Sequence, residues 1–155
     1  MTIHLPLFRC THYTGFSSRD IVIAGHQAST KDFWEKLNKQ FEPVISSLVI
    51  LEASQGAKEK ADMRENAIQG FRIIDITGEA EQLADLLIIK KGVPEKFPED
   101  ALHIALASVE KINFIATWNF IHINNPFMKD KIKKIIEDAG YNCPVLASPE
   151  ELLGE

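Results

Sequence analysis

Apolar residues in this chain form short runs that alternate with longer segments of mixed polarity. The short runs are rich in β-branched and other apolar residues and predict strands at 1–8, 43–46, 72–76, 113–117 and 144–146. The longer segments predict helices at 18 or 20 to about 40, 46 or 47 to 54, 58–69, 77 to 90 or 91, around Asp100, and 126–139. Strands alternating with helices of this length predict an α/β fold with a mostly parallel central sheet and helices on both faces.

The helix that contains Asp100 is apolar on nearly every side. One face carries Leu102, Ala105, Leu106 and Val109, and Ala101, Ile104 and Ala107 cover most of the remainder. This pattern predicts a central helix with a carboxylate in its first turn. A buried carboxylate is costly unless it is compensated, and a bound cation is one way to compensate it. The alternative is an acid that only complements the helix dipole.

Two further polar residues stand at comparable places. Glu52 interrupts an apolar helix, and Asn119 follows Thr117 and Trp118 at the end of a predicted strand. Singly, these residues are also explained as a glutamate at a helix edge and an amide that stabilises a turn. Ligands of parallel α/β sheets bind beyond the carboxyl ends of the strands. Taken with Asp100, the three residues therefore indicate an oxygen-rich cation site.

Composition and charge limit the class of protein. A length of 155 residues, 45% hydrophobic and 25% charged, predicts one soluble domain spanning 1–155. The apolar runs are too short to cross a bilayer and no secretory signal is recognised, so we expect a cytoplasmic protein. Cys10 and Cys143 lack metal-like spacing and are expected to be reduced thiols. The net charge of −5 disfavours a broad basic surface for nucleic acid, but it does not exclude a nuclease.

Four segments together resemble the PIN-domain family, in particular VapC-like toxin nucleases and related bacterial PIN proteins. They are 47–53 around Glu52, 99–105 around Asp100, 117–123 around Asn119, and 18–27, which is similar to the first long helix of one subgroup. The similarity extends from about 13 to 153. The motifs around Asp100 and Asn119 are the more specific ones.

The resemblance implies a three-layer α/β/α fold and Mg²⁺- or Mn²⁺-dependent hydrolysis of RNA phosphodiester bonds. Glu52 matches the second acidic position of the family, Asp100 the third, and Asn119 a fourth that holds aspartate or asparagine. These three residues are therefore the expected catalytic and metal-binding residues. The metal ions would polarise a phosphate oxygen and activate a water molecule. RNA, a cognate antitoxin protein and a second copy of the chain are the expected partners.

The chain departs from the family at the first strand, where relatives carry an acid. No acid occurs in 1–13, and Asp20, the first carboxylate, aligns with the helix that follows. Losing one anionic ligand is expected to weaken metal binding. His4 or His12 could supply a ligand instead, although imidazole suits Mn²⁺ or Zn²⁺ better than Mg²⁺. The alternative function is a catalytically impaired PIN-fold protein that binds RNA or another protein.

Several other polar residues have two possible interpretations, and two other α/β folds are excluded. His103 lies one turn after Asp100 and either contacts substrate or, more simply, lies at a helix surface or core edge. Lys129, Lys131, Lys133 and Lys134 either meet a phosphate backbone or form a solvated helix face. A receiver domain is excluded because the required acids and lysine are missing. A dinucleotide-binding domain is excluded because no glycine-rich loop joins a strand to a helix.

Overall fold

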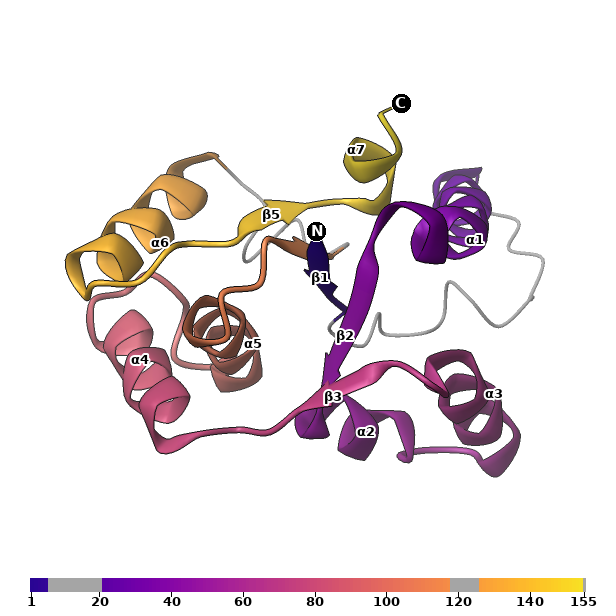
Figure 1. The fold of residues 1–155 in the computed structure, drawn as a ribbon, viewed down its shortest axis with the longest axis horizontal. Helices are drawn as coiled ribbons and strands as arrows, with labels where there is room; N and C mark the ends of the chain where they lie inside the picture. The colour runs from indigo at the N-terminus through magenta and orange to yellow at the C-terminus, as the bar shows by residue number, and fades with distance from the viewer. Residues whose placement is uncertain (6–20, 118–125, 155) are drawn as a thin grey trace.

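The structure, a computed structural model, describes residues 1–5, 21–117 and 126–154, with side chains from residue 31 onward in the second range. The elements are β1 (Thr2–His4), α1 (Ile21–Gln40), β2 (Glu42–Ser46), α2 (Ser47–Ala53), α3 (Lys58–Ile68), β3 (Arg72–Ile74), α4 (Gly78–Ile89), α5 (Pro98–Val109), β4 (Phe114–Ala116), α6 (Pro126–Asp138), β5 (Val145–Ala147) and α7 (Pro149–Leu153). Figure 1 shows their arrangement.

The five strands form one sheet in the order β3-β2-β1-β4-β5, and every neighbouring pair is parallel. The predicted α/β fold with a parallel sheet is therefore confirmed. β1 is the central strand. Its residue His4 is in register with Val44 of β2 and with Ile115 of β4. Because all strands run the same way, their carboxyl ends meet at one edge of the sheet, where β1 ends at His4 and β2 at Ser46.

Helices cover both faces of this sheet (Figure 1). One face packs against α4, α5 and α6 through a core that includes Val44, Ile74, Ile104, Ile115 and Ile136. The opposite face packs against α1 and α7 through a second core cluster, made of Ile3, Leu5, Phe33, Leu37, Ile45, Val49 and Ala116. Consecutive strand residues thus enter opposite cores, as Val44 and Ile45 do, which follows from the two-residue period of a strand.

Local capping signals explain where several helices begin and end. The Ser46 hydroxyl accepts a hydrogen bond from the Val49 amide at the start of α2, and Thr77 accepts one from the Ala80 amide at the start of α4. Both starts agree with the sequence-based expectation. Gly140, with a φ of 90°, follows the end of α6. At Gly92, after α4, a Cβ atom would lie 2.8 Å from Ile135 Cδ1, so a larger residue there would displace the end of the Ile135 side chain.

Two predictions at the ends of the chain need correction. The first strand was expected at 1–8 but is observed at Thr2–His4, and residues 6–20 lie outside the described part. α7 was not predicted, because five residues are too short to show a helical period; Ser148 and Glu151 form its capping box. None of the helices in the described ranges is long and apolar enough to span a membrane.

Candidate functional site

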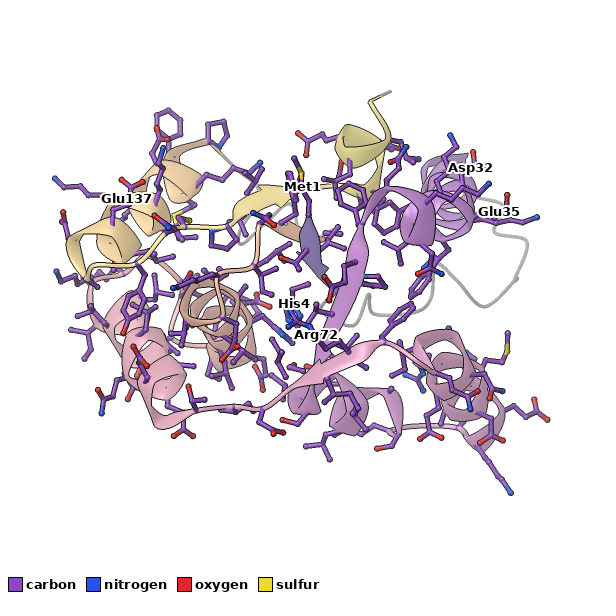
Figure 2. All side chains as sticks on the ribbon, viewed as in Figure 1. Met1, His4, Asp32, Glu35, Arg72 and Glu137 are labelled. Atoms are coloured by element: carbon purple, nitrogen blue, oxygen red, sulfur yellow. The ribbon has the colours of Figure 1, made fainter. Side chains whose placement is uncertain are left out.

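A histidine occupies the middle of an otherwise apolar layer. His4 is the last residue of β1, and its register neighbours Val44 and Ile115 belong to the core beneath α5. Its side chain is fully buried, and Figure 2 shows it deep inside the fold. A buried imidazole requires hydrogen-bond partners, and His4 has two.

His4 is joined to the sheet backbone and to α5. Its Nδ1 lies 3.3 Å from the Val44 carbonyl oxygen, and its Nε2 lies 3.0 Å from His103 Nδ1. A carbonyl oxygen can only accept, so His4 Nδ1 is the donor, and His4 Nε2 must accept from His103 Nδ1. Burial, followed by the nearby His103, lowers the pKa of His4 from 6.5 to about 3, and the hydrogen bond to Val44 opposes this shift. His4 is therefore neutral at pH 7.

His103 connects this buried pair to Glu52. The imidazole lies on α5 with 5% of its surface exposed, and its Nε2 is 3.7 Å from Glu52 Oε1. This distance is too long for a direct hydrogen bond but within ion-pair range. Because His103 Nδ1 donates to His4, Nε2 is the nitrogen that faces the carboxylate, and the contact is an ion pair when Nε2 also carries a proton. Three elements, β1, α5 and α2, thus contribute to one polar chain inside the protein.

Glu52 reaches this position because α2 begins directly after β2. The Ser46 cap starts the helix at the carboxyl end of the strand, and Val49 and Ala53 turn toward the core. Leu51 is exposed on the outer side of α2, and Glu52 lies between the two sides with 25% of its side chain exposed. The carboxylate is thus partly accessible to solvent while its inner oxygen faces His103.

Asp100 lies in the first turn of α5 and is partly buried. It precedes His103 by three residues, so both occupy the same face of the helix. α5 leads into the parallel strand β4, which places its first turn at the carboxyl edge of the sheet. Glu52, which faces His103, therefore lies against the helix that carries Asp100. Asn119, the third predicted site residue, lies outside the described residues.

The donor types at this edge fit a divalent cation. Carboxylate oxygens suit Mg²⁺ and Mn²⁺, and the His103 imidazole suits Mn²⁺ better than Mg²⁺. Within the described residues, however, no three His, Cys, Asp or Glu side chains form a ligand group. Glu52 and Asp100 would be the protein ligands from this part of the chain.

The two histidines have other roles than sequence reasoning suggested. His4 uses both ring nitrogens inside the core, so it has no lone pair left for a metal ion and is not the alternative metal ligand that the sequence suggested. His12 lies outside the described residues. His103 is neither exposed nor merely at a core edge, because it bridges His4 and Glu52. Two features of the sequence point to these roles. His4 stands alone between the apolar residues Ile3 and Leu5, and His103 follows Asp100 by three residues.

Within the described ranges, the remaining candidates do not add a reactive group. Cys143 is a free thiol, as expected, and burial raises its pKa to about 11, with a further contribution from Glu137, so it is a poor nucleophile at neutral pH. Cys10 lies outside the described residues. On α6, Lys133 lies 3.9 Å from Glu137 one turn later, and both side chains are exposed. This pair fits the solvated-face interpretation of the helix.

In comparisons with protein-family models, with curated proteins and with solved structures, the chain has no significant match. The parallel five-stranded α/β fold is the part of the family resemblance that the structure supports directly.

Proposed function

We propose that this protein is a metal-dependent ribonuclease of the PIN type. One observation supports the proposal most strongly. Glu52 on α2 faces His103 of α5, the helix that carries Asp100 in its first turn, at the edge of the sheet where the parallel strands end. Two carboxylates near one edge of the sheet support the proposal of a shared cation site.

In this proposal Glu52, Asp100 and Asn119 hold Mg²⁺ or Mn²⁺. The bound ion would polarise a phosphate oxygen of RNA and lower the pKa of a water molecule. Glu52 and Asp100 supply the anionic charge that attracts the cation, and their partial exposure leaves room for a phosphate of the substrate. A toxin of this kind would be held inactive by an antitoxin protein, and a homodimer is the proposed assembly.

A second candidate is a catalytically impaired PIN-fold protein that binds RNA or a protein without hydrolysis. The observation that favours this candidate is the small number of anionic ligands among the described residues. β1 ends in a neutral, buried histidine, Glu52 already faces His103, and the described residues contain no group of three metal ligands. A site with few anionic ligands would bind Mg²⁺ weakly.

Calorimetric titration with Mn²⁺ separates the two candidates. The nuclease proposal expects saturable binding that Asp100→Asn abolishes. Asp85→Asn, which changes an exposed acid on α4, should leave binding unchanged and controls for general charge effects. Absence of binding at millimolar Mn²⁺ would contradict the nuclease proposal and favour the impaired protein.

Cleavage of a mixed RNA pool then tests hydrolysis itself. Glu52→Gln keeps the shape of the side chain but removes its charge, so activity should fall to background. Glu81→Gln, at an exposed position of α4, should retain activity. Equal degradation by wild type and Glu52→Gln would show that Glu52 takes no part in the reaction.

A further inference from the structure

We propose that His103 is a positioning residue that fixes the Glu52 carboxylate, and that His4 in turn fixes His103 to the backbone of the sheet. The inference rests on the proposed function in that Glu52 is taken to act at the site. It adds two residues that the family resemblance does not assign. Neither histidine would contact substrate or metal.

The four groups form an ordered path from the interior to the surface. The path begins at the Val44 carbonyl, which the parallel pairing of β1 and β2 holds in place. It continues through His4, fully buried, and His103, 5% exposed, to the Glu52 side chain, 25% exposed. The path therefore begins at a rigid strand backbone and ends at an accessible carboxylate. This order is expected if the two histidines hold Glu52 in position.

The hydrogen-bond polarity allows only one arrangement of the rings. The Val44 carbonyl also accepts the Leu5 amide at 3.0 Å, so it is a fixed acceptor for His4 Nδ1. His4 Nε2 then accepts from His103 Nδ1, which turns His103 Nε2 toward Glu52. A flipped His103 ring would lose the bond to His4 and remove the nitrogen from Glu52. The orientation of the His103 ring is therefore set by the sheet, and Nε2 donates toward Glu52 when it carries a proton.

The His4–His103 pair is not needed to fill the core. The register neighbours of His4 are Val44 and Ile115, and an apolar residue between them would complete the same layer. Replacing a buried polar pair by apolar groups of similar shape is often neutral or stabilising. In this proposal the histidines contribute the orientation of Glu52. Partners of this kind behind a metal-binding residue typically contribute about 10–100-fold in metal affinity.

Two substitutions of His103 separate positioning from mere packing. His103→Gln places an amide nitrogen near the position of Nε2, facing Glu52, whereas His103→Asn places one near Nδ1, facing His4. In Mn²⁺ titrations of the full chain, His103→Asn should weaken binding by about 10–100-fold, and His103→Gln should stay much closer to wild type. Urea unfolding of both variants provides the stability comparison. The proposal is wrong if the loss of Mn²⁺ affinity in the two variants only parallels their loss of stability. It is also wrong if His103→Asn binds Mn²⁺ as tightly as wild type.

A second measurement does not depend on metal. Long-range ¹⁵N–¹H spectra of the histidine-labelled protein should show His4 as the Nδ1-protonated tautomer. Glu52→Gln should shift the ring nitrogens of His103 more than those of His4, while Glu81→Gln should shift neither. If wild type binds no Mn²⁺, the proposed function fails, but these spectra still decide the contact. An unchanged His103 spectrum in Glu52→Gln would refute the contact between His103 and Glu52.

Discussion

Ile3 and His4 are adjacent in the central strand, yet they face two very different cores. Ile3 points into the layer beneath α1 and α7, where the buried neighbours from the other strands, Ile45 and Ala116, are apolar. His4 points into the layer beneath α5 and bonds to His103. Among the described residues, the first side of the sheet contributes apolar packing. The second side combines packing with a polar chain that ends at an accessible carboxylate, and this difference identifies the side on which function should be sought.

The apolar side should be the more sensitive to truncation. Phe33 of α1 is fully buried in this core, so Phe33→Ala should lower the free energy of unfolding by about 3–5 kcal/mol through lost burial and a cavity. Glu35 lies on the outer side of the same helix (Figure 2), and Glu35→Ala should change stability by less than about 0.5 kcal/mol. Urea unfolding measures both. Similar small effects would mean that α1 is not packed as described.

The polar side should show a pH dependence that the apolar side lacks. The pKa of His4 is about 3 in the folded protein, below its ordinary value of 6.5, so the unfolded chain binds a proton that the folded protein rejects. Stability contributed by neutral His4 is therefore present above pH 6.5 and declines as the pH falls toward 3. Between neutral pH and pH 5 the loss should be about 2 kcal/mol.

His4→Leu is the control for this dependence. Leucine does not titrate, so the variant should lose this part of the decline in urea unfolding between pH 7 and pH 5. An identical slope in wild type and His4→Leu would show that His4 is not held neutral in the core.

Helix caps on the two sides should contribute equally and modestly. Thr77 caps α4 on the polar side, and Ser148 caps α7 on the apolar side. Thr77→Ala and Ser148→Ala should each lower the free energy of unfolding by about 1 kcal/mol, because one amide loses its acceptor. Thr77→Ser, which keeps a hydroxyl, is the matched control for the first. A loss several times larger at one cap would show that its helix supports the fold more than its contacts indicate.

Local patterns predicted much of the fold. The β-branched runs that became β2 and β3, and the start signals at Ser46 and Thr77, depend on neighbouring residues and were recognised. The all-parallel order follows from the alternation of strands and helices. α7 was missed because its five residues rest on a single capping box.

The candidate site stays a prediction. Apolar surroundings indicated Glu52 and Asp100, and the structure places Glu52 beside His103, on the helix that carries Asp100. The contact between His4 and His103 joins residues 99 positions apart in the sequence. It depends on the register of β1 with β2 and β4 and on the rotation of α5 above them. No local pattern encodes these quantities, so sequence reasoning treated the two histidines separately.

The central claim is that Glu52 and Asp100 serve one cation. A crystal structure with Mn²⁺, analysed by anomalous diffraction, tests it most directly. The account predicts a peak at about 2.2 Å from an oxygen of each carboxylate, with His103 behind Glu52. Glu52 and Asp100 in separate surroundings, with no peak between them at saturating Mn²⁺, would contradict it.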